Sequence, residues 1–428
     1  MITFAARKTR KVAASVSLFA LIAAPAVALS QDAVDELAQR ELQITEAIDS
    51  VTLEHGPQAR ELIEPLTALT LHYEETGNLR LADTAIERLL SVIRANYGLY
   101  SLEQVPSIQL LMAHERERGN AAAAWELEQE LIRLGLRNPD DVRTARIFRD
   151  VGDGRLDLLE RYDAGELPPE IELGCYYNDS NEYRRAQRRG AHSIHTAPGE
   201  QHGSVCAAGS RSQAKRSLTS DAYRFYMAAI EVFQRNEFVT SEEFRTLLTR
   251  IVHSSYEHIA PSVGRRGLNL LITSYEQSGD HLSRLETLVQ LADWDLLFSS
   301  VLGTRYMEEA HINYQAAYTQ LLEHGAAQES IDALFSPDMP VMLPAFRPNP
   351  LVSPETPTSR AHLDVEFIVT AEGESDGIEI LETTSADVPR NVRNDLRSAI
   401  KHGRFRPIMA NGRLADSEPI VIRYFVNP

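Results

Sequence analysis

Hydrophobic side chains recur at helical spacing through most of the chain, from about residue 32 to residue 335. Within this region, two segments match each other at a period of 42 residues. The matching pairs are Gly56 and Gly98, Leu66 and Ile108, Leu69 and Leu111, Gly77-Asn78 and Gly119-Asn120, Ala82 and Ala124, and Leu89 and Leu131. Such a period predicts repeated pairs of antiparallel helices, with leucines in the groove between them, alanine where they approach closely and Gly-Asn in the turn.

The spacing changes to alternation in the last part of the chain, from Ala361 to Pro428. Apolar residues at every second position predict strands with one apolar face. These positions are Leu363, Val365, Phe367 and Val369 and, after the polar turn 372–377, Ile378 and Ile380. The two runs together predict a β-hairpin.

A helix and a closing strand follow this hairpin. Pro389 suits the first turn of the helix, Asp387 is a candidate N-cap, and Gly403 ends the helix. The helix places Val392, Leu396 and Ile400 on one face, and the strand does the same with Ile420, Ile422, Tyr424 and Val426. This order of elements predicts a small ββαβ domain.

The last part of the chain resembles the C-terminal domain of TonB-family proteins. The resemblance is carried by the hairpin, the helix followed by Arg404-Phe405-Arg406-Pro407, the Asn411-Gly412 turn and the closing strand, over about the last 68 residues. It implies a periplasmic domain that binds protein partners, in the best-known cases by strand addition to an outer-membrane receptor. A generic small α+β domain is the alternative interpretation.

The helical pattern resembles the tetratricopeptide repeat. The first copy reads Leu66, Leu69, Tyr73, Gly77, Ala82 and Ile86, and the same offsets recur at Leu268, Leu271, Tyr275, Gly279, Leu288 and Leu291. Arg284 takes the position of the small residue in the later copy, so its packing is expected to differ. The resemblance implies a solenoid whose concave surface binds peptides or proteins, and unrelated helical hairpins are the alternative.

Further helices are expected at 223–234, 241–255 and 306–323, where the apolar spacing is also helical. Aromatic residues in the helical region stand among apolar neighbours. Trp125, Trp294, Tyr306, Tyr314 and Tyr318 are therefore expected to pack in the core rather than to bind a ligand.

The first residues have the features of a targeting signal. A basic stretch (Arg7, Lys8, Arg10 and Lys11) precedes an apolar run at 12–24 and a small-x-small site at Ala26-Val27-Ala28. This run is short for a membrane span, which needs about 20 residues. We therefore expect a signal peptide cleaved near residue 28 and a Gram-negative periplasmic protein, with an uncleaved inner-membrane anchor as the alternative.

The same segment departs from the TonB proteins that transduce energy. Those members carry a Ser followed four positions later by a His in their membrane helix. Here Ser15 is followed at that spacing by Phe19, and the segment contains no His. Direct coupling to the proton motive force is therefore not the first prediction, although an energy transducer in transport through outer-membrane receptors stays as the alternative.

The mature chain is expected to be strongly acidic. The formal charge is -18, and the signal carries four basic and no acidic side chains, so its removal leaves -22. Such a surface disfavours nucleic acid and anionic lipid as partners. Nothing after the signal is apolar for long enough to span a bilayer.

The two cysteines, Cys175 and Cys206, lie in a stretch that breaks the helical pattern. In an oxidising compartment they predict a disulfide, which would contribute roughly 3 kcal/mol by closing a loop of about 30 residues. Free thiols are the alternative. The loop also holds a basic island of Arg184, Arg185, Arg188, Arg189, His192, His195 and His202. A solvated loop is the first interpretation, with contact to an acidic partner or metal binding as alternatives.

The patterns together predict an α+β multidomain chain, with an N-terminal all-α helical-repeat (tetratricopeptide-like) solenoid and a small ββαβ TonB-like C-terminal domain. The predicted parts are a signal peptide at 1–28, repeats at 32–170, a disulfide-tied insert at 171–218, a second helical region at 219–335, a Pro-rich linker at 336–360 and the TonB-like domain at 361–428.

No catalytic motif stands out, so no catalytic, cofactor-binding or metal-ligating residue is assigned. Paired carboxylates such as Asp140-Asp141 are expected to serve as helix caps. The predicted function is that of a non-enzymatic periplasmic adaptor that binds protein partners of the envelope. A metal-binding protein or an enzyme using the His-rich loop is the less favoured alternative.

Overall fold

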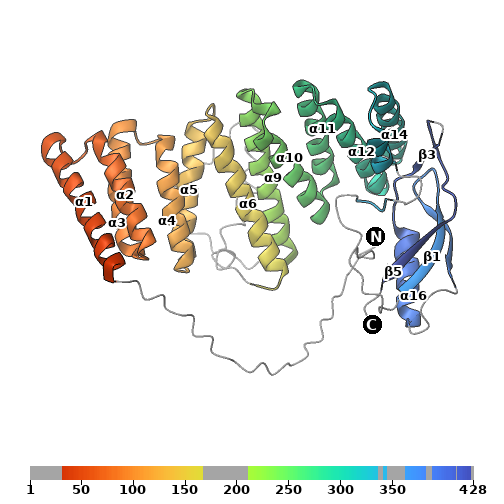
Figure 1. The fold of residues 1–428 in the computed structure, drawn as a ribbon, viewed down its shortest axis with the longest axis horizontal. Helices are drawn as coiled ribbons and strands as arrows, with labels where there is room; N and C mark the ends of the chain where they lie inside the picture. The colour runs from red at the N-terminus through yellow and green to blue at the C-terminus, as the bar shows by residue number, and fades with distance from the viewer. Residues whose placement is uncertain are drawn as a thin grey trace. The chain divides into compact units, whose positions relative to one another are not determined.

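The structure, a computed structural model, describes residues 31–166, 211–335, 341–344, 362–381, 388–410 and 412–425. Over these residues the chain is mostly helical and ends in a small antiparallel sheet (Figure 1). This confirms the coarse prediction of an all-α region followed by a small domain of helix and strands. The chain divides into two compact units, Met1–Ser107 and Ile108–Pro428, and each is described separately.

The described part of the first unit, before α4 begins at Val105, contains three α-helices and two short 3₁₀ turns. Their bounds are α1 Gln31–His55, η1 Arg60–Leu62, α2 Ile63–Glu75, α3 Leu79–Tyr97 and η2 Leu102–Gln104. Helix α2 packs against both α1 and α3. The core between them consists of fully buried side chains such as Leu62, Leu66 and Val92. The apolar faces read from the sequence are therefore the faces that pack.

The turns of the repeated segments have the same backbone geometry. Gly77 ends the first hairpin helix with φ +71°, and Gly119 does so after α4 (Val105–Glu117) with φ +74°. This left-handed region favours glycine, which explains the recurrence of this residue type. Ala82 in α3 and Ala124 in α5 (Ala121–Arg137) are both buried. The 42-residue period therefore corresponds to two helical hairpins of similar construction.

The helices of the second unit pack largely on their neighbours in the chain. After α5 they are α6 Val142–Asp163, α9 Arg211–Arg235, η3 Phe238–Thr240, α10 Glu242–Glu257, α11 Pro261–Ser278, α12 His281–Leu297, α13 Ser299–Leu302, α14 Arg305–Glu323 and α15 Gln328–Leu334. Helix α6 packs extensively on α9. Helix α9 begins at Arg211, earlier than the predicted start at residue 223.

The small sheet has the order β2-β1-β5, with antiparallel pairing throughout. Its elements, with the helix and short hairpin between them, are β1 His362–Val369, β2 Ser375–Ile380, α16 Arg390–His402, β3 Ile408–Ala410, β4 Arg413–Ala415 and β5 Ile420–Phe425. Strands β1 and β5 are labelled in Figure 1. The four alternating apolar positions of β1 are all fully buried. The predicted apolar face of this strand is therefore confirmed.

Two details of this domain differ from the sequence prediction. Strand β2 begins at Ser375, inside the stretch predicted as a turn, because Gly377 (φ +64°) provides an extra residue that the pairing with β1 accommodates as a bulge. The Gly412 turn also closes a hairpin of its own, β3–β4, which the ββαβ prediction lacks. The candidate cap Asp387 and the strand position Val426 lie outside the described residues.

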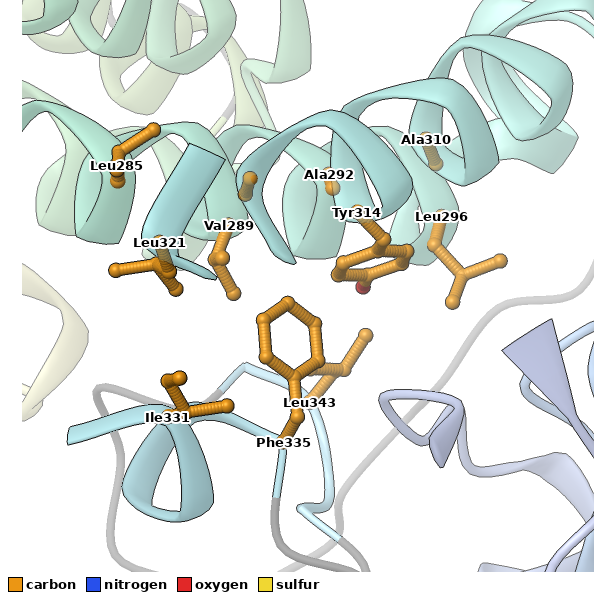
Figure 2. Close-up of a cluster of buried hydrophobic side chains, with 11 residues drawn as sticks. Leu285, Val289, Ala292, Leu296, Ala310, Tyr314, Leu321, Ile331, Phe335 and Leu343 are labelled. Atoms are coloured by element: carbon orange, nitrogen blue, oxygen red, sulfur yellow. The ribbon is translucent and has the colours of Figure 1, made fainter. Parts of the chain in front are cut away.

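A shared apolar cluster joins the last helices to part of the predicted linker (Figure 2). It contains buried side chains of α12, α14 and α15, among them Leu296, Tyr314 and Ile331, and the linker residue Leu343. Met409 and Leu414, from the β3–β4 hairpin, pack against it. The helical region and the C-terminal domain therefore have continuous packing within this unit.

Candidate functional site

The sequence motif Arg404-Phe405-Arg406-Pro407 directly follows α16. The Phe405 side chain is 1% exposed, and its ring centroid lies 5.4 Å from that of Phe367 in β1. The Phe405 amide donates a 2.9 Å hydrogen bond to the carbonyl of Gly373 in the β1–β2 turn. The phenylalanine of the motif is therefore part of the core of the sheet domain.

Arg406 points the other way and reaches helix α12. Its Nε and Nη2 atoms donate to Oδ1 and Oδ2 of Asp293 in α12 at 2.9 and 2.6 Å. Its Nη1 atom donates to the Leu334 carbonyl at 2.5 Å. The side chains of Arg406 and Asp293 are buried, 6% and 7% exposed. A paired, hydrogen-bonded guanidinium is the form in which such a charge is tolerated inside a protein.

Tyr314 of α14 completes this buried group. Its hydroxyl donates to Asp293 Oδ1 at 2.8 Å, so that the carboxylate receives bonds from two elements. Burial raises the pKa of the Tyr314 hydroxyl well above its ordinary value. Burial alone would lower the pKa of Arg406, but the Asp293 carboxylate raises it. Arg406 therefore remains a cation, and Tyr314 a neutral donor.

The linker segment 341–344 pairs with the backbone of the same motif. The Leu343 amide donates to the Arg404 carbonyl and the Arg406 amide to the Val341 carbonyl, each at 2.8 Å. Met342 and Phe405 form the antiparallel bridge between them. The Arg404 side chain forms an ion pair with Glu374. The contacts described for Arg404, Phe405 and Arg406 are therefore contacts with other segments of the same chain.

The partner of Arg406 was missed by sequence reasoning, although a signal exists. Asp293 and Asp295 flank Trp294 within an apolar stretch of α12. Each carboxylate binds an arginine, since Asp295, which is fully buried, receives Nε of Arg265 at 2.7 Å. A charged residue on a helix face that is otherwise apolar indicates a buried partner, but it does not identify that partner.

A cavity of about 290 Å³ lies among α4, α5 and α6. Its lining consists of Arg116, Gly119, Ala121, Ala124, Trp125, Glu128, Gly154, Arg155, Asp157, Leu158 and Arg161. Small residues account for the space, because a Cβ built on Gly154 would have its nearest neighbour at 3.9 Å, the Glu128 carboxylate. The size is close to the lower end of ordinary ligand pockets, about 300 Å³. We refer to this cavity as the Trp125 pocket.

A buried ion pair lies at the base of the Trp125 pocket. Arg155 Nη1 and Nη2 donate to the two oxygens of Glu128 at 3.1 and 2.5 Å, and both side chains are 4% exposed. The Arg155 guanidinium also lies 4.9 Å from the centre of the Trp125 ring. Arg116 approaches the same Glu128 at 3.7 Å from the solvent side.

The two tryptophans have different environments. Trp294 is 2% exposed, and its Nε1 donates to the Pro261 carbonyl at 2.9 Å, which confirms its predicted place in the core. Trp125 is only half-buried and lines the pocket, so the prediction of core packing is wrong for this residue. Its helical spacing among apolar residues cannot distinguish a core position from a position at the edge of a cavity.

Other predictions concern parts of the chain that the structure does not describe. The signal peptide 1–28, the cysteines Cys175 and Cys206 and the basic island at 184–202 lie outside the described residues. Within the described ranges, no group of three or more His, Cys, Asp or Glu side chains is arranged to hold a metal ion. Among the helices described, none is both long and apolar enough to cross a membrane.

The fold and site define a helical-hairpin protein with a small docked sheet domain. No family model matches the chain, and no curated protein matches it. Among solved structures, the chain is similar to one titled "Crystal structure of BtubC (BKLC) from P. vanneervenii", with 12% identity and a TM-score of 0.33. The similarity covers 76% of this chain and 99% of that chain. A TM-score at this level is too low to indicate a shared fold.

Proposed function

We propose that this protein is a non-enzymatic periplasmic adaptor, in which tetratricopeptide-like repeats and a TonB-like C-terminal domain bind proteins of the cell envelope. The observation that carries the proposal is the position of β5. This strand pairs with β1 on one side, and no other described strand pairs with its opposite edge. An edge strand of this kind can accept a strand from a partner.

The surface of β5 supports this role. Val421 is 52% exposed, whereas Tyr424 of the same strand is 1% exposed and packs in the domain core. The strand is therefore anchored by one face and offers an apolar side chain on the other. The motif Arg404-Phe405-Arg406-Pro407 acts at a different place, where it holds the domain on α12 and leaves the β5 edge available.

The test is site-specific photo-crosslinking of the full-length protein in its own periplasm. A photoreactive amino acid at Val421 is expected to give discrete adducts with envelope proteins. The matched control is the same substitution at Val301 of α13, which is 65% exposed but lies on a helix. Equal or absent adducts at the two positions would contradict strand addition at β5.

The mass of the N-terminus is determined in the same sample. A mature chain beginning near Leu29 or Gln31 is the expected result for a periplasmic adaptor. Retention of residues 1–28, together with recovery of inner-membrane motor subunits, would instead favour an energy transducer. The two measurements therefore separate the proposed function from its alternative.

A further inference from the structure

The Trp125 pocket has a rigid base. The Arg155–Glu128 pair is held by two hydrogen bonds and by contact with the Trp125 ring. Phe225 of α9 lies on Arg155 as well, with its ring centre 6.0 Å from the guanidinium. Because a buried charge that lost its partner would be strongly destabilising, these groups are expected to keep their positions when a ligand binds. The pocket is therefore preorganised.

The rim of the pocket carries further cations. The side chains of Arg116 and Arg161 are 47% and 40% exposed. Arg116 is 3.7 Å from Glu128, a carboxylate that already receives two bonds from Arg155. Arg161 pairs at 3.1 Å with Glu166, whose side chain is 62% exposed. The exposed Arg161–Glu166 pair typically contributes below about 1 kcal/mol, so a ligand carboxylate can compete for Arg161. Arg116 lies beyond hydrogen-bond distance of Glu128, whose two oxygens already bind Arg155, so its guanidinium can also bind a ligand carboxylate.

The acidic groups of the lining do not cancel this charge. Three arginines line the pocket, against Glu128 at its base and the exposed Asp157 at its rim. The lining is therefore net basic in a chain whose formal charge is -18. An acidic partner would be repelled by most of the surface and attracted here, which favours one docking position.

The remaining lining is apolar. Trp125 and Leu158 contribute large apolar side chains to the lining. Ala121 and Ala124 also line the pocket, and their small side chains leave space for a ligand beside Trp125 and Leu158. An inorganic anion would leave this part of the pocket unused. A peptide that carries a carboxylate close to an apolar side chain would fill both parts.

We propose that the Trp125 pocket binds an acidic segment of a partner protein, with an Asp or Glu carboxylate at Arg116 and Arg161 and a neighbouring apolar side chain against Trp125 and Leu158. The inference rests on the proposed adaptor function, to which it adds a second docking site and the chemistry of its ligand. It concerns helices α4 to α6 and is independent of the β5 edge.

The test uses the full-length protein and a panel of labelled, end-capped peptides. Each peptide contains one Asp or Glu at a set distance from one Leu or Phe, and its control replaces the acid with Asn or Gln. Fluorescence polarisation is expected to show that at least one spacing binds and that its amide control binds at least about 10-fold more weakly, since a charge-assisted hydrogen bond is lost. If no peptide of the panel binds, or if an acidic peptide and its amide control bind equally well, the inference is overturned.

Variants of the protein then locate the binding. Arg116→Gln and Arg161→Gln together are expected to weaken the selected peptide at least about 10-fold, since two cationic contacts are lost. Arg133→Gln, at an exposed position of α5 outside the pocket lining, is the matched control and is expected to leave binding unchanged. Unchanged affinity in the double variant, with an intact far-UV spectrum, would also overturn the inference.

The two proposals fail separately. Val421 crosslinks without any acid-dependent peptide binding would leave the adaptor function standing and remove the Trp125 pocket from it. Acid-dependent binding that requires Arg116 and Arg161, without Val421 crosslinks, would support the pocket and contradict the β5 edge.

Discussion

Asp293 and Arg406 lie 113 positions apart in the sequence and form a buried ion pair with hydrogen bonds of 2.6 and 2.9 Å. Asp293 belongs to helix α12, and Arg406 follows α16 in the C-terminal domain. The pair therefore fixes the small domain on the helical region within the second unit. The motif Arg404-Phe405-Arg406-Pro407 supplies this contact, and the β5 edge of the sheet lies elsewhere in the domain.

Loss of Arg406 is expected to be strongly destabilising. The change Arg406→Gln leaves Asp293 buried without its cation, which typically costs about 3–5 kcal/mol. Denaturant unfolding of the full chain measures the loss. Arg404→Gln is the matched control, because the partner of Arg404, Glu374, is 58% exposed, and such pairs contribute at most about 1 kcal/mol. Equal effects of the two changes would contradict the role of the buried pair.

Gly264 of α11 is expected to tolerate no side chain. A Cβ at this position would lie 2.2 Å from the Trp294 ring, which is buried and held by the Pro261 carbonyl. The change Gly264→Ala should therefore destabilise the protein by about 1–3 kcal/mol, as measured by thermal unfolding. Gly154→Ala is the control, since its Cβ would have no neighbour closer than 3.9 Å. It should be neutral or stabilising by up to about 1 kcal/mol.

His311 of α14 is expected to make stability fall at acidic pH. Burial lowers its pKa below the ordinary 6.5, although Glu372 opposes the shift. Its Nε2 atom is buried and has no hydrogen-bond partner among the residues that the structure describes. Because the unfolded chain binds the proton more readily, stability is retained above about pH 6.5 and falls as the pH drops toward the lowered pKa.

The measurement is the free energy of unfolding between pH 8 and pH 5, in wild type and His311→Gln. Removing the imidazole should reduce the loss of stability in this range. His55→Gln, at an exposed position of α1, serves as the control and should leave the pH profile unchanged. The prediction is contradicted if His311→Gln and wild type have the same profile.

Ala82 of α3 is expected to require a small side chain. It is fully buried in α3, a helix that packs on α2 in the first unit. The change Ala82→Leu should overpack this interface and lower stability by about 1–3 kcal/mol in thermal unfolding. Thr84→Leu, on the exposed side of the same helix, adds a similar side chain and should change stability by less than about 0.5 kcal/mol. A harmless Ala82→Leu would show that the repeat position has no packing role.

The order of elements could be predicted largely from the sequence, because local patterns determine it. The helical spacing identified the hairpins around Gly77 and Gly119, and alternation identified the buried face of β1. The bulge at Gly377 was missed, because its position depends on the register with β1. The start of α9 at Arg211 was also missed, since polar residues begin that helix and give it little apolar periodicity.

By itself, the sequence determined the helical hairpins, the apolar strand face and the motif at Arg404–Pro407. Each depends on residues within a few positions of one another, for which side-chain spacing is sufficient. Only the tertiary structure decided that Arg406 meets Asp293 and that Trp125 lines a pocket with Arg155. These arrangements depend on which helix faces meet and on where small residues leave space. Local spacing is the same for a core residue and for a residue at a site, so packing alone distinguishes them.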